Sequence, residues 1–320
     1  MRIGVLLPHF GRHCTRRNVI DVSRRLEAWG FDSVWVRDHI LFEPHGLEGN
    51  DQTFLDPFVT LSAVAGATER IGLGTAVLIP VRWPLKVAQD FASLSFLANR
   101  RVDAGFGLGF SAKELAAAGF SYEDRKQVFE QTIGICQEVW SRDEVSWTDD
   151  RFGFENVSLK PKPAVPIVTW YGGSTKASVR RAATYCDGWL PGRIPMATLD
   201  DRLTLIRQTG EERGRRILVG VLPLVVVDSS RERARSLVDI AALAPASEGS
   251  DRWVTASGGF ETIEDLEGLV IAGTPDDCVV EALKFRDRGV DEFVFDFRLD
   301  FERYEEQAQM VAEEVVPALR

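Results

Sequence analysis

Residues 2–39 read RIGVLLPHFGRHCTRRNVIDVSRRLEAWGFDSVWVRDH and contain one strand, one helix and a second strand. The apolar run of residues 3–7 predicts a buried strand, and the apolar spacing within residues 17–29 predicts an amphipathic helix. Gly30 ends this helix, because glycine readily adopts the left-handed conformation found just after helix C-termini. Residues 32–38, DSVWVRD, predict the second strand.

The same alternation continues along the chain. The predicted strands are residues 3–7, 32–38, 71–80, 101–107, 166–171, 188–190, 217–227 and 291–297. The predicted helices are residues 17–29, a helix that begins at Pro57, and residues 83–99, 122–141, 175–185, 275–288 and 301–319. Apolar strands that alternate with helices indicate a parallel sheet covered on both faces. Eight such strands favour a (β/α)8 TIM barrel in a single domain over residues 1–320, with a doubly wound open sheet as the alternative.

Residues 244–268 interrupt this alternation. The segment is polar, contains glycine and carries Trp253. We interpret it as an insertion on the C-terminal face of the barrel, where loops vary most freely.

Composition limits the partners of this chain. The net charge is −10 and the isoelectric point about 5.1, which argues against nucleic-acid binding, where a basic face is expected. The four cysteines form no CxxC pair, so we expect neither a disulfide framework nor a metal site.

No membrane or export signal is visible in the sequence. Met1 runs directly into the apolar residues 3–7 without a signal-peptide layout, and the longest apolar run, residues 219–227, is too short to span a bilayer. We therefore expect a cytoplasmic protein with no membrane partner, and we expect it to form a homodimer.

Histidines follow the first two predicted strands. Active sites of TIM barrels lie at the C-terminal strand ends, where His9, His39 and the nearby His45 fall. Histidine can transfer a proton near neutral pH, so we take His9 and His39 as candidate catalytic residues and leave His45 as a loop residue. Asp38 is a third candidate, because it can orient His39 or cap the following turn.

Glycines mark two other strand ends. Gly172, Gly173 and Ser174 precede a helix, and such a loop can direct backbone amides at an anion. Arg193 follows the next strand and can pair with the same anion. The glycines of residues 105–109 lack the spacing of a dinucleotide fingerprint, and we interpret them as a close approach of backbone to a flat ring.

Taken together, these segments resemble the luciferase-like monooxygenase family over most of the chain. The matching segments are residues 2–11, 30–39, 68–77, 105–109, 114–119 with Arg125, 161–163, 171–173, 181–183 with 187–189, and 273–275. The resemblance implies a TIM barrel that binds FMN or coenzyme F-420, a 5-deazaflavin, at its C-terminal mouth. It is weakest over residues 244–268.

The resemblance also implies roles around the redox ring. Asp38 and His39 match residues that face the ring. Ala76–Val77 matches the family's non-prolyl cis peptide, which forms a bulge behind the isoalloxazine. Gly107 and Gly109 match the segment beside the ring.

A second group of residues is implied to hold the cofactor phosphate. Gly172, Gly173 and Arg193 match the phosphate-binding loops of the family. Tyr171 and Ser174 flank the two glycines, so we include them among the cofactor-binding residues.

The resemblance leaves three functions open. The first is a coenzyme F-420-dependent oxidoreductase that transfers hydride to or from a small organic substrate, and the N-terminal segments resemble this branch most. The second is an FMN-dependent monooxygenase, and the third is a family member that binds cofactor without turnover. We expect an apolar or aromatic substrate in a pocket walled by Phe10, Phe42, Trp83, Phe110 and Trp253. Sugar-phosphate dehydrogenases of this family carry a catalytic glutamate close to the position of Phe110, which argues against that substrate class.

Overall fold

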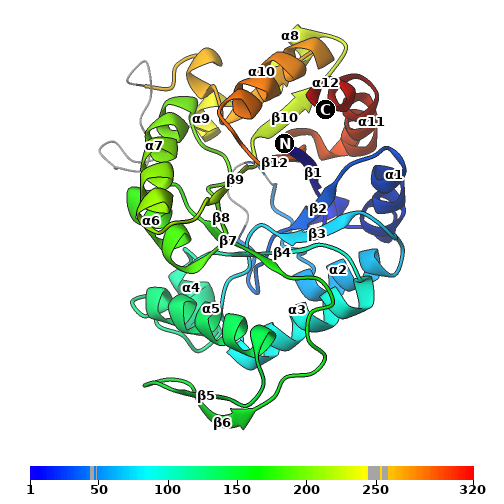
Figure 1. Cartoon of the computed structure of the whole chain (residues 1–320). Helices are drawn as coiled ribbons and strands as arrows, with labels where there is room; N and C mark the ends of the chain where they lie inside the picture. Colours follow the sequence, from blue (N-terminus) through cyan, green and yellow to red (C-terminus); the bar gives the residue numbers. More distant parts are fainter. Residues whose placement is uncertain (44–46, 48, 244–252, 254–258) are drawn as a thin grey trace.

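The computed structural model describes residues 1–43, 47, 49–243, 253 and 259–320, and its centre is a closed barrel of eight parallel strands (Figure 1). The strands follow one another around the barrel in the order β1-β12-β9-β8-β7-β4-β3-β2. Their bounds are β1 (Arg2–Leu6), β2 (Ser33–Val36), β3 (Gly72–Thr75), β4 (Val102–Phe106), β7 (Val168–Gly172), β8 (Gly188–Leu190), β9 (Leu218–Val221) and β12 (Glu292–Phe295). Each of the eight predicted strands supplies one barrel strand, so the predicted TIM barrel is confirmed and the open-sheet alternative is wrong.

Helices surround the barrel. Their bounds are α1 (Val22–Ala28), α2 (Pro57–Ala65), α3 (Pro84–Ala98), α4 (Ala112–Ala117), α5 (Arg125–Ser141), α6 (Lys176–Tyr185), α7 (Met196–Glu212), α8 (Arg231–Ser236), α9 (Ile240–Leu243), α10 (Pro275–Asp287), α11 (Tyr304–Met310) and α12 (Val316–Leu319). Shorter helical segments are η1 (Gly11–His13), η2 (Arg17–Asp21), η3 (Glu264–Leu266), η4 (Arg298–Arg303) and η5 (Val311–Val315). Within the described ranges, no helix combines the length and apolar character needed to cross a bilayer.

The structure adds elements that were not predicted. Helix α7 covers the barrel between β8 and β9. It was not predicted, although Leu199, Leu203 and Ile206 recur at the three- to four-residue spacing of a helix. The short helix α4 follows β4. An antiparallel hairpin, β5 (Val145–Thr148) and β6 (Gly153–Val157), extends away from the barrel (Figure 1).

The predicted strand at residues 217–227 is two strands. β9 belongs to the barrel, whereas β10 (Leu224–Val227) leaves it and pairs with β11 (Val270–Gly273). Pro223 lies at the break, which is consistent with the missing amide hydrogen of proline, because such a residue cannot donate within a central strand. The predicted insertion belongs to this region, and of residues 244–268 the structure describes only 253 and 259–268.

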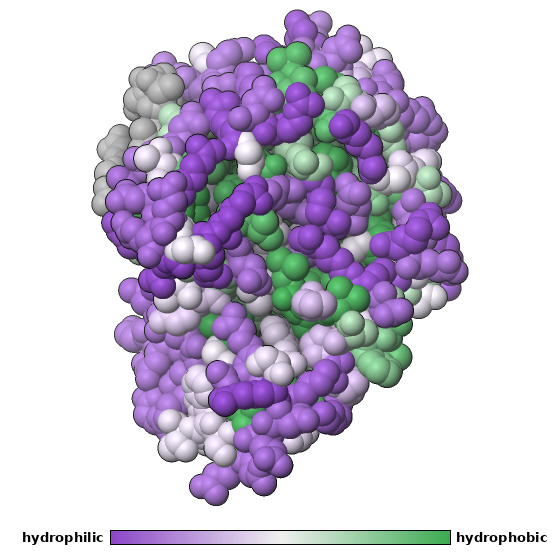
Figure 2. Space-filling model, viewed as in Figure 1, coloured by the Kyte–Doolittle hydropathy of each residue, from purple (hydrophilic) through white to green (hydrophobic). Residues whose placement is uncertain are grey.

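Two buried tryptophans fill the inside of the barrel. Trp35 donates from Nε1 to Ser33 Oγ at 2.9 Å, and Trp170 donates from Nε1 to Asp103 Oδ1 at 2.8 Å. Glycine is required opposite them: a Cβ on Gly74 would lie 2.4 Å from Trp35. Figure 2 shows the complementary outer surface, where hydrophilic side chains cover most of the helices and hydrophobic ones gather toward the middle of the view.

Candidate active site

A cavity of about 690 Å³ opens at the C-terminal ends of the neighbouring strands β2, β3, β4, β7 and β8. Its volume lies in the range of small-molecule and cofactor sites. The predicted site residues that line it are Asp38, His39, Ala76, Val77, Gly107, Gly109, Tyr171, Gly172, Gly173, Ser174 and Arg193. The structure therefore brings together all of the predicted site residues except His9.

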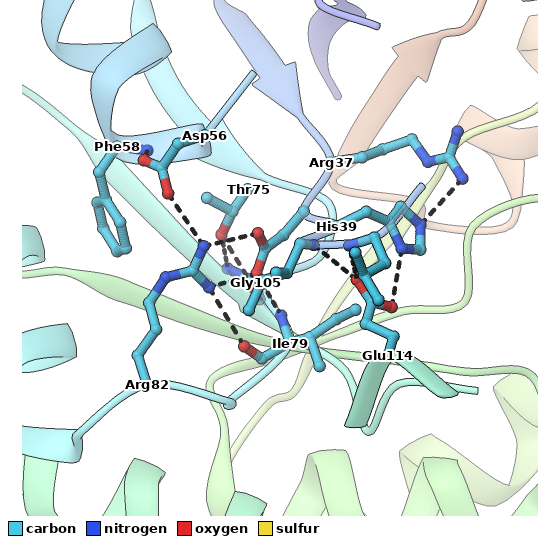
Figure 3. Close-up of polar contacts among 12 residues, drawn as sticks. Arg37, His39, Asp56, Phe58, Thr75, Ile79, Arg82, Gly105 and Glu114 are labelled. Atoms are coloured by element: carbon cyan, nitrogen blue, oxygen red, sulfur yellow. Dashed lines mark hydrogen bonds and ion pairs between the residues drawn. The ribbon is translucent and has the colours of Figure 1, made fainter. Parts of the chain in front are cut away.

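His39 stands at one end of this cavity, three residues beyond the end of β2 (Figure 3). Its ring lies edge-on to the rings of Phe54 and Phe110, with ring centres 5.2 Å and 5.9 Å away. Its Nδ1 lies 3.1 Å from Oε2 of Glu114, and its Nε2 lies 3.4 Å from Nη2 of Arg37. These contacts hold the ring plane and place Nε2 next to Arg37, which lines the cavity together with His39.

Glu114 is a buried residue of helix α4, and its side chain is 1% exposed. Besides His39, it accepts hydrogen bonds from the backbone amides of Ile40 at 2.6 Å and Leu41 at 3.2 Å. Burial by itself raises the pKa of Glu114, but these hydrogen bonds together hold that pKa below its usual value. Glu114 is therefore a carboxylate near neutral pH.

The partners of His39 define its tautomer. A carboxylate can only accept a hydrogen bond, so Nδ1 of His39 carries the hydrogen that bonds to Glu114. An arginine can only donate, so Nε2 of the neutral ring presents its lone pair toward Arg37. Nε2 is therefore the nitrogen at which the neutral ring takes up a proton, once Arg37 no longer donates to it.

Asp38 forms an ion pair and does not orient His39. It accepts from Nη1 and Nη2 of Arg82 at 2.6 Å and 2.9 Å, and Arg82 also donates to Asp56 at 3.0 Å (Figure 3). Asp38 further accepts from the amide of Ile79 at 2.9 Å. The idea that Asp38 orients His39 is thus wrong, because Glu114 occupies that position. Asp38 joins the ends of β2 and β3 and the start of α2, where Asp56 caps the helix.

His9 lies outside the cavity, and its predicted place in the cleft is wrong. The side chain is fully buried: Nδ1 donates to the carbonyl of Leu7 at 2.9 Å, and Nε2 accepts from the amide of Arg37 at 3.0 Å. Phe54 covers the ring, because residues 53–55 pair with the backbone at residues 9–11. Burial, the largest effect, lowers the pKa of His9 from 6.5 to about 3. His9 is a neutral link between β1 and β2.

Val77 forms the floor of the cavity. The peptide bond between Ala76 and Val77 is cis, which confirms the prediction at this position. A Cβ on Gly107 would lie 2.5 Å from Val77 Cγ2, and one on Gly172 would lie 3.0 Å from Val77 Cγ1. Gly107 and Gly172 therefore make room for Val77, and the close approach of residues 105–109 to a flat ring stays a prediction.

The opposite end of the cavity is rich in hydrogen-bond donors. Gly173, with φ +111°, leads through Ser174 into Thr175, whose side chain caps helix α6. Thr175, just before α6, and Ser178, in the first turn of α6, border the cavity, and Arg193 lines it from beyond β8. This is the composition of an anion site, with a helix N-terminus and a guanidinium.

Tyr171 contributes less to the cavity than predicted. It is 1% exposed, and its ring packs on Phe129 with ring centres 4.8 Å apart. Its hydroxyl accepts from Nη1 of Arg181 at 3.1 Å. The side chain therefore supports the wall from behind.

The predicted aromatic walls are largely wrong. Phe110 lines the cavity and is 62% exposed. Phe10 and Phe42 are buried behind His39, and Trp83 packs on Phe152 away from the cavity. Trp253 packs on Phe260 in a separate apolar cluster. His45 lies outside the described residues.

Several residues of the site were not predicted from sequence. Glu114 lies three residues after Ser111, a spacing typical of a capping box, in which the glutamate returns to the helix start. Ser111 does cap α4 by accepting from the Glu114 amide at 3.2 Å, but the carboxylate bonds to residues 39–41 instead. Only the tertiary contact distinguishes the two roles. Arg37 and Arg82 carry no signal at all in the sequence pattern.

No metal centre accompanies these groups. Within the part of the chain that the structure describes, no three histidine, cysteine or acidic side chains are gathered as metal ligands. The four cysteines are all free thiols.

Comparisons with known proteins agree with this geometry. The profile of the luciferase-like monooxygenase family matches residues 1–292. An F420-dependent glucose-6-phosphate dehydrogenase from Amycolatopsis mediterranei is 27% identical over 322 residues, covering 95% of each chain. An F420-dependent hydroxymycolic acid dehydrogenase from Mycobacterium tuberculosis is 32% identical over 192 residues, which are 59% of this chain and 52% of that one.

A solved structure extends the likeness to the whole fold. It is an F420-dependent secondary alcohol dehydrogenase in complex with an F420-acetone adduct, with a TM-score of 0.82 at 20% identity. The alignment covers 100% of this chain and 99% of that one. Barrel, strand-end cavity and family profile together define an oxidoreductase of the TIM-barrel class. The chain belongs to the luciferase-like monooxygenase family.

Proposed function

We propose that this protein is a coenzyme F-420-dependent oxidoreductase, acting on a small, mainly apolar or aromatic organic substrate. The observation that carries the proposal is the placement of His39 Nε2 at one end of a cavity whose other end is an anion site. The names of the two relatives above, both F420-dependent dehydrogenases, support this cofactor.

The residues of the cavity fit a flat ring that carries a phosphate. Val77 and Gly107 offer an apolar floor for a ring. Gly173, the start of α6 and Arg193 offer donors for a phosphate. When bound, the deazaflavin supplies or accepts a hydride.

The chain's own groups handle the proton. In the direction of alcohol oxidation, His39 Nε2 takes the hydroxyl proton of the substrate, and in the reverse direction the protonated ring returns it. Glu114 keeps Nδ1 protonated and stabilises the positive charge that the ring gains. Asp38 and Arg82 hold the loop of Ile79 at the cavity wall.

Direct titration tests the cofactor. The protein contains eight tryptophans, whose fluorescence can be quenched by either cofactor. We expect coenzyme F-420 to bind at least about tenfold more tightly than FMN, a difference of about 1.4 kcal/mol. Arg193→Ala should weaken coenzyme F-420 binding about tenfold, whereas Arg24→Ala, on the outer side of α1, should not.

The same titration decides between the alternatives. Tighter binding of FMN, with oxygen consumption once the flavin is reduced, would favour the monooxygenase that the family name allows. Tight coenzyme F-420 binding without turnover of any alcohol or ketone would favour a cofactor-binding protein that is not an enzyme.

A further inference from the structure

Arg82 is a charged residue that contacts the wall of the cavity through Asp38 without belonging to the described lining. Its Nη1 donates to Asp38 Oδ2 at 2.6 Å, and its Nη2 donates to Asp38 Oδ1 at 2.9 Å (Figure 3). Nη2 also donates to Oδ2 of Asp56 at 3.0 Å, and Asp56 caps helix α2. The guanidinium therefore joins the end of β2 to the start of α2 through charge-assisted hydrogen bonds.

Residues 78–79, directly after the floor of the cavity, lie between two anchors. On the side of β4, the amide of Leu78 donates to the carbonyl of Gly105 at 2.7 Å. On the side of β2, the amide of Ile79 donates to Oδ2 of Asp38 at 2.9 Å. The segment is thus held by main-chain pairing on one side and by a single carboxylate on the other.

The carboxylate of Asp38 depends on Arg82. The side chain of Asp38 is 1% exposed, and a buried charge without its partner is strongly unfavourable. Burial raises the pKa of Asp38 even with Arg82 beside it, so without Arg82 the carboxyl group takes up a proton more readily. A neutral carboxyl group accepts a weaker hydrogen bond than a carboxylate does. Loss of Arg82 therefore weakens the anchor of Ile79.

The same anchor relates the floor of the cavity to His39. Asp38 directly precedes His39 in the chain, and Ile79 follows the floor residue Val77 by two positions. The bond between Asp38 and Ile79 therefore ties the backbone beside the histidine to the backbone beside the floor. Glu114 holds the ring of His39 from the other side, at 3.1 Å.

We propose that Arg82 is a positioning residue for the redox ring: by holding Asp38, it fixes the floor on which the ring lies relative to His39. This role rests on the function proposed above, in which the ring of the cofactor lies on Val77. A bound ring gains freedom to move when the anchor is lost, whereas Gly173 and the start of α6 still hold the phosphate. A charged residue outside the cavity lining thereby aligns the hydride carrier with the proton-transfer group.

Three variants separate this positioning role from a general loss of stability. Arg82→Met combined with Asp38→Asn removes the ion pair without leaving a buried charge, and the new amide oxygen can still accept from Ile79. Asp56→Asn is the matched control, because its amide oxygen can still cap α2 while the contact to Arg82 is lost. Both should lower the melting temperature, but only the first should loosen the ring. Arg82→Lys keeps the charge without the fork and should hold the ring in part.

Time-resolved fluorescence anisotropy of bound coenzyme F-420 measures the motion of the ring, because the deazaflavin is fluorescent. In the wild type and in Asp56→Asn, we expect the anisotropy to decay only with the tumbling of the whole protein. In the double variant a faster component, on the nanosecond scale or below, should appear. The dissociation constant of coenzyme F-420 should rise about threefold to tenfold in the double variant and less than about twofold in Asp56→Asn.

The outcomes separate this role from the proposed function. A fast component in the wild type, its absence from the double variant, or an equal one in Asp56→Asn overturns the role of Arg82 alone. Should the double variant not fold, the presence or absence of the fast component in Arg82→Lys decides. If coenzyme F-420 does not bind the wild type, the proposed function is overturned, and FMN serves as the probe of the same floor. If neither cofactor binds, both proposals are overturned.

Discussion

The ends of strands β1 and β2 carry a histidine each, and the two histidines have opposite environments. His9 is sealed beneath Phe54 and bonds only to backbone groups, those of Leu7 and Arg37. His39 bonds to the carboxylate of Glu114 on one side and meets the cavity on the other. The two environments differ because residues 53–55 cover the end of β1 and do not cover the cavity.

This comparison shows that proton chemistry depends on access and on a charged partner. His9 has neither, and burial lowers its pKa to about 3, so it stays neutral. His39 has both, since Glu114 can stabilise the positive ring and Nε2 faces a cavity. We therefore expect the two histidines to differ in what their loss removes, catalysis in one case and stability in the other.

Replacing His39 should give the largest effect. His39→Ala removes the proton-transfer group, and we expect kcat to fall about 10²- to 10⁴-fold. The dissociation constant of coenzyme F-420 should change less than about twofold, because the proton is exchanged mainly in the transition state. Steady-state kinetics and tryptophan quenching measure the two quantities. A similar loss in cofactor affinity would make His39 a binding residue and remove its contrast with His9.

Replacing Glu114 should give an intermediate effect. Glu114→Gln keeps the size of the side chain but removes the charge and no longer restricts Nδ1 to the donor role. We expect kcat to fall roughly tenfold to a hundredfold, which is part of the His39 effect, with cofactor affinity unchanged. The pH profile of kcat should shift in the same variant.

A suitable control keeps the charge. Glu114→Asp retains the carboxylate and should recover part of the rate. If Glu114→Gln lowered only the melting temperature, with an unchanged rate and pH profile, Glu114 would be a structural residue.

His9 should make the free energy of unfolding decrease as the pH is lowered. Its folded pKa of about 3 lies below the ordinary value of 6.5, so the unfolded chain binds this proton more readily. The contribution of His9 to the free energy of unfolding is complete above about pH 6.5 and is lost as the pH falls from there toward 3. The slope for one proton is about 1.4 kcal/mol per pH unit.

His9→Asn tests this slope. The amide can still donate to Leu7, but the Arg37 amide loses its acceptor, so we expect a cost of roughly 1–3 kcal/mol at pH 7. Urea unfolding at pH 7 and pH 5 should then show that the free energy of unfolding falls less between these two pH values in the variant than in the wild type. His13→Asn is the control, because His13 lies at the rim and bonds to Arg12. An equal acid slope in wild type and His9→Asn would contradict the buried, neutral state of His9.

The spacing of apolar residues, glycines and histidines along the chain was sufficient to predict the barrel and most of the residues that line the cavity. Residues 3–7 are an apolar run and residues 34–36 a shorter one, and each is followed within three residues by a histidine at the end where parallel strands open. Strand direction is shared around a parallel barrel, so these ends must converge on one face. This is why the residues lining the cavity could be predicted from positions far apart in the chain.

What failed was the prediction of partners. Asp38 was given two possible roles, orienting His39 or capping the following turn, and Glu114 had the spacing of a helix cap, yet the structure pairs Asp38 with Arg82 and Glu114 with His39. Phe10 and Phe42 were expected to form the pocket walls and instead pack behind it. Each of these outcomes depends on which loop crosses which strand end.

The sequence by itself determined the eight strands, their alternation with helices and the face on which histidines and glycines gather, because hydrophobic periodicity and glycine conformations act over a few residues. Only the tertiary structure decided that His39 and not His9 meets the cavity, because this depends on residues 53–55 covering one strand end and on Glu114 reaching the other from α4. Burial and hydrogen-bond partners are set by segments distant in the chain, and they decide whether a histidine can exchange a proton.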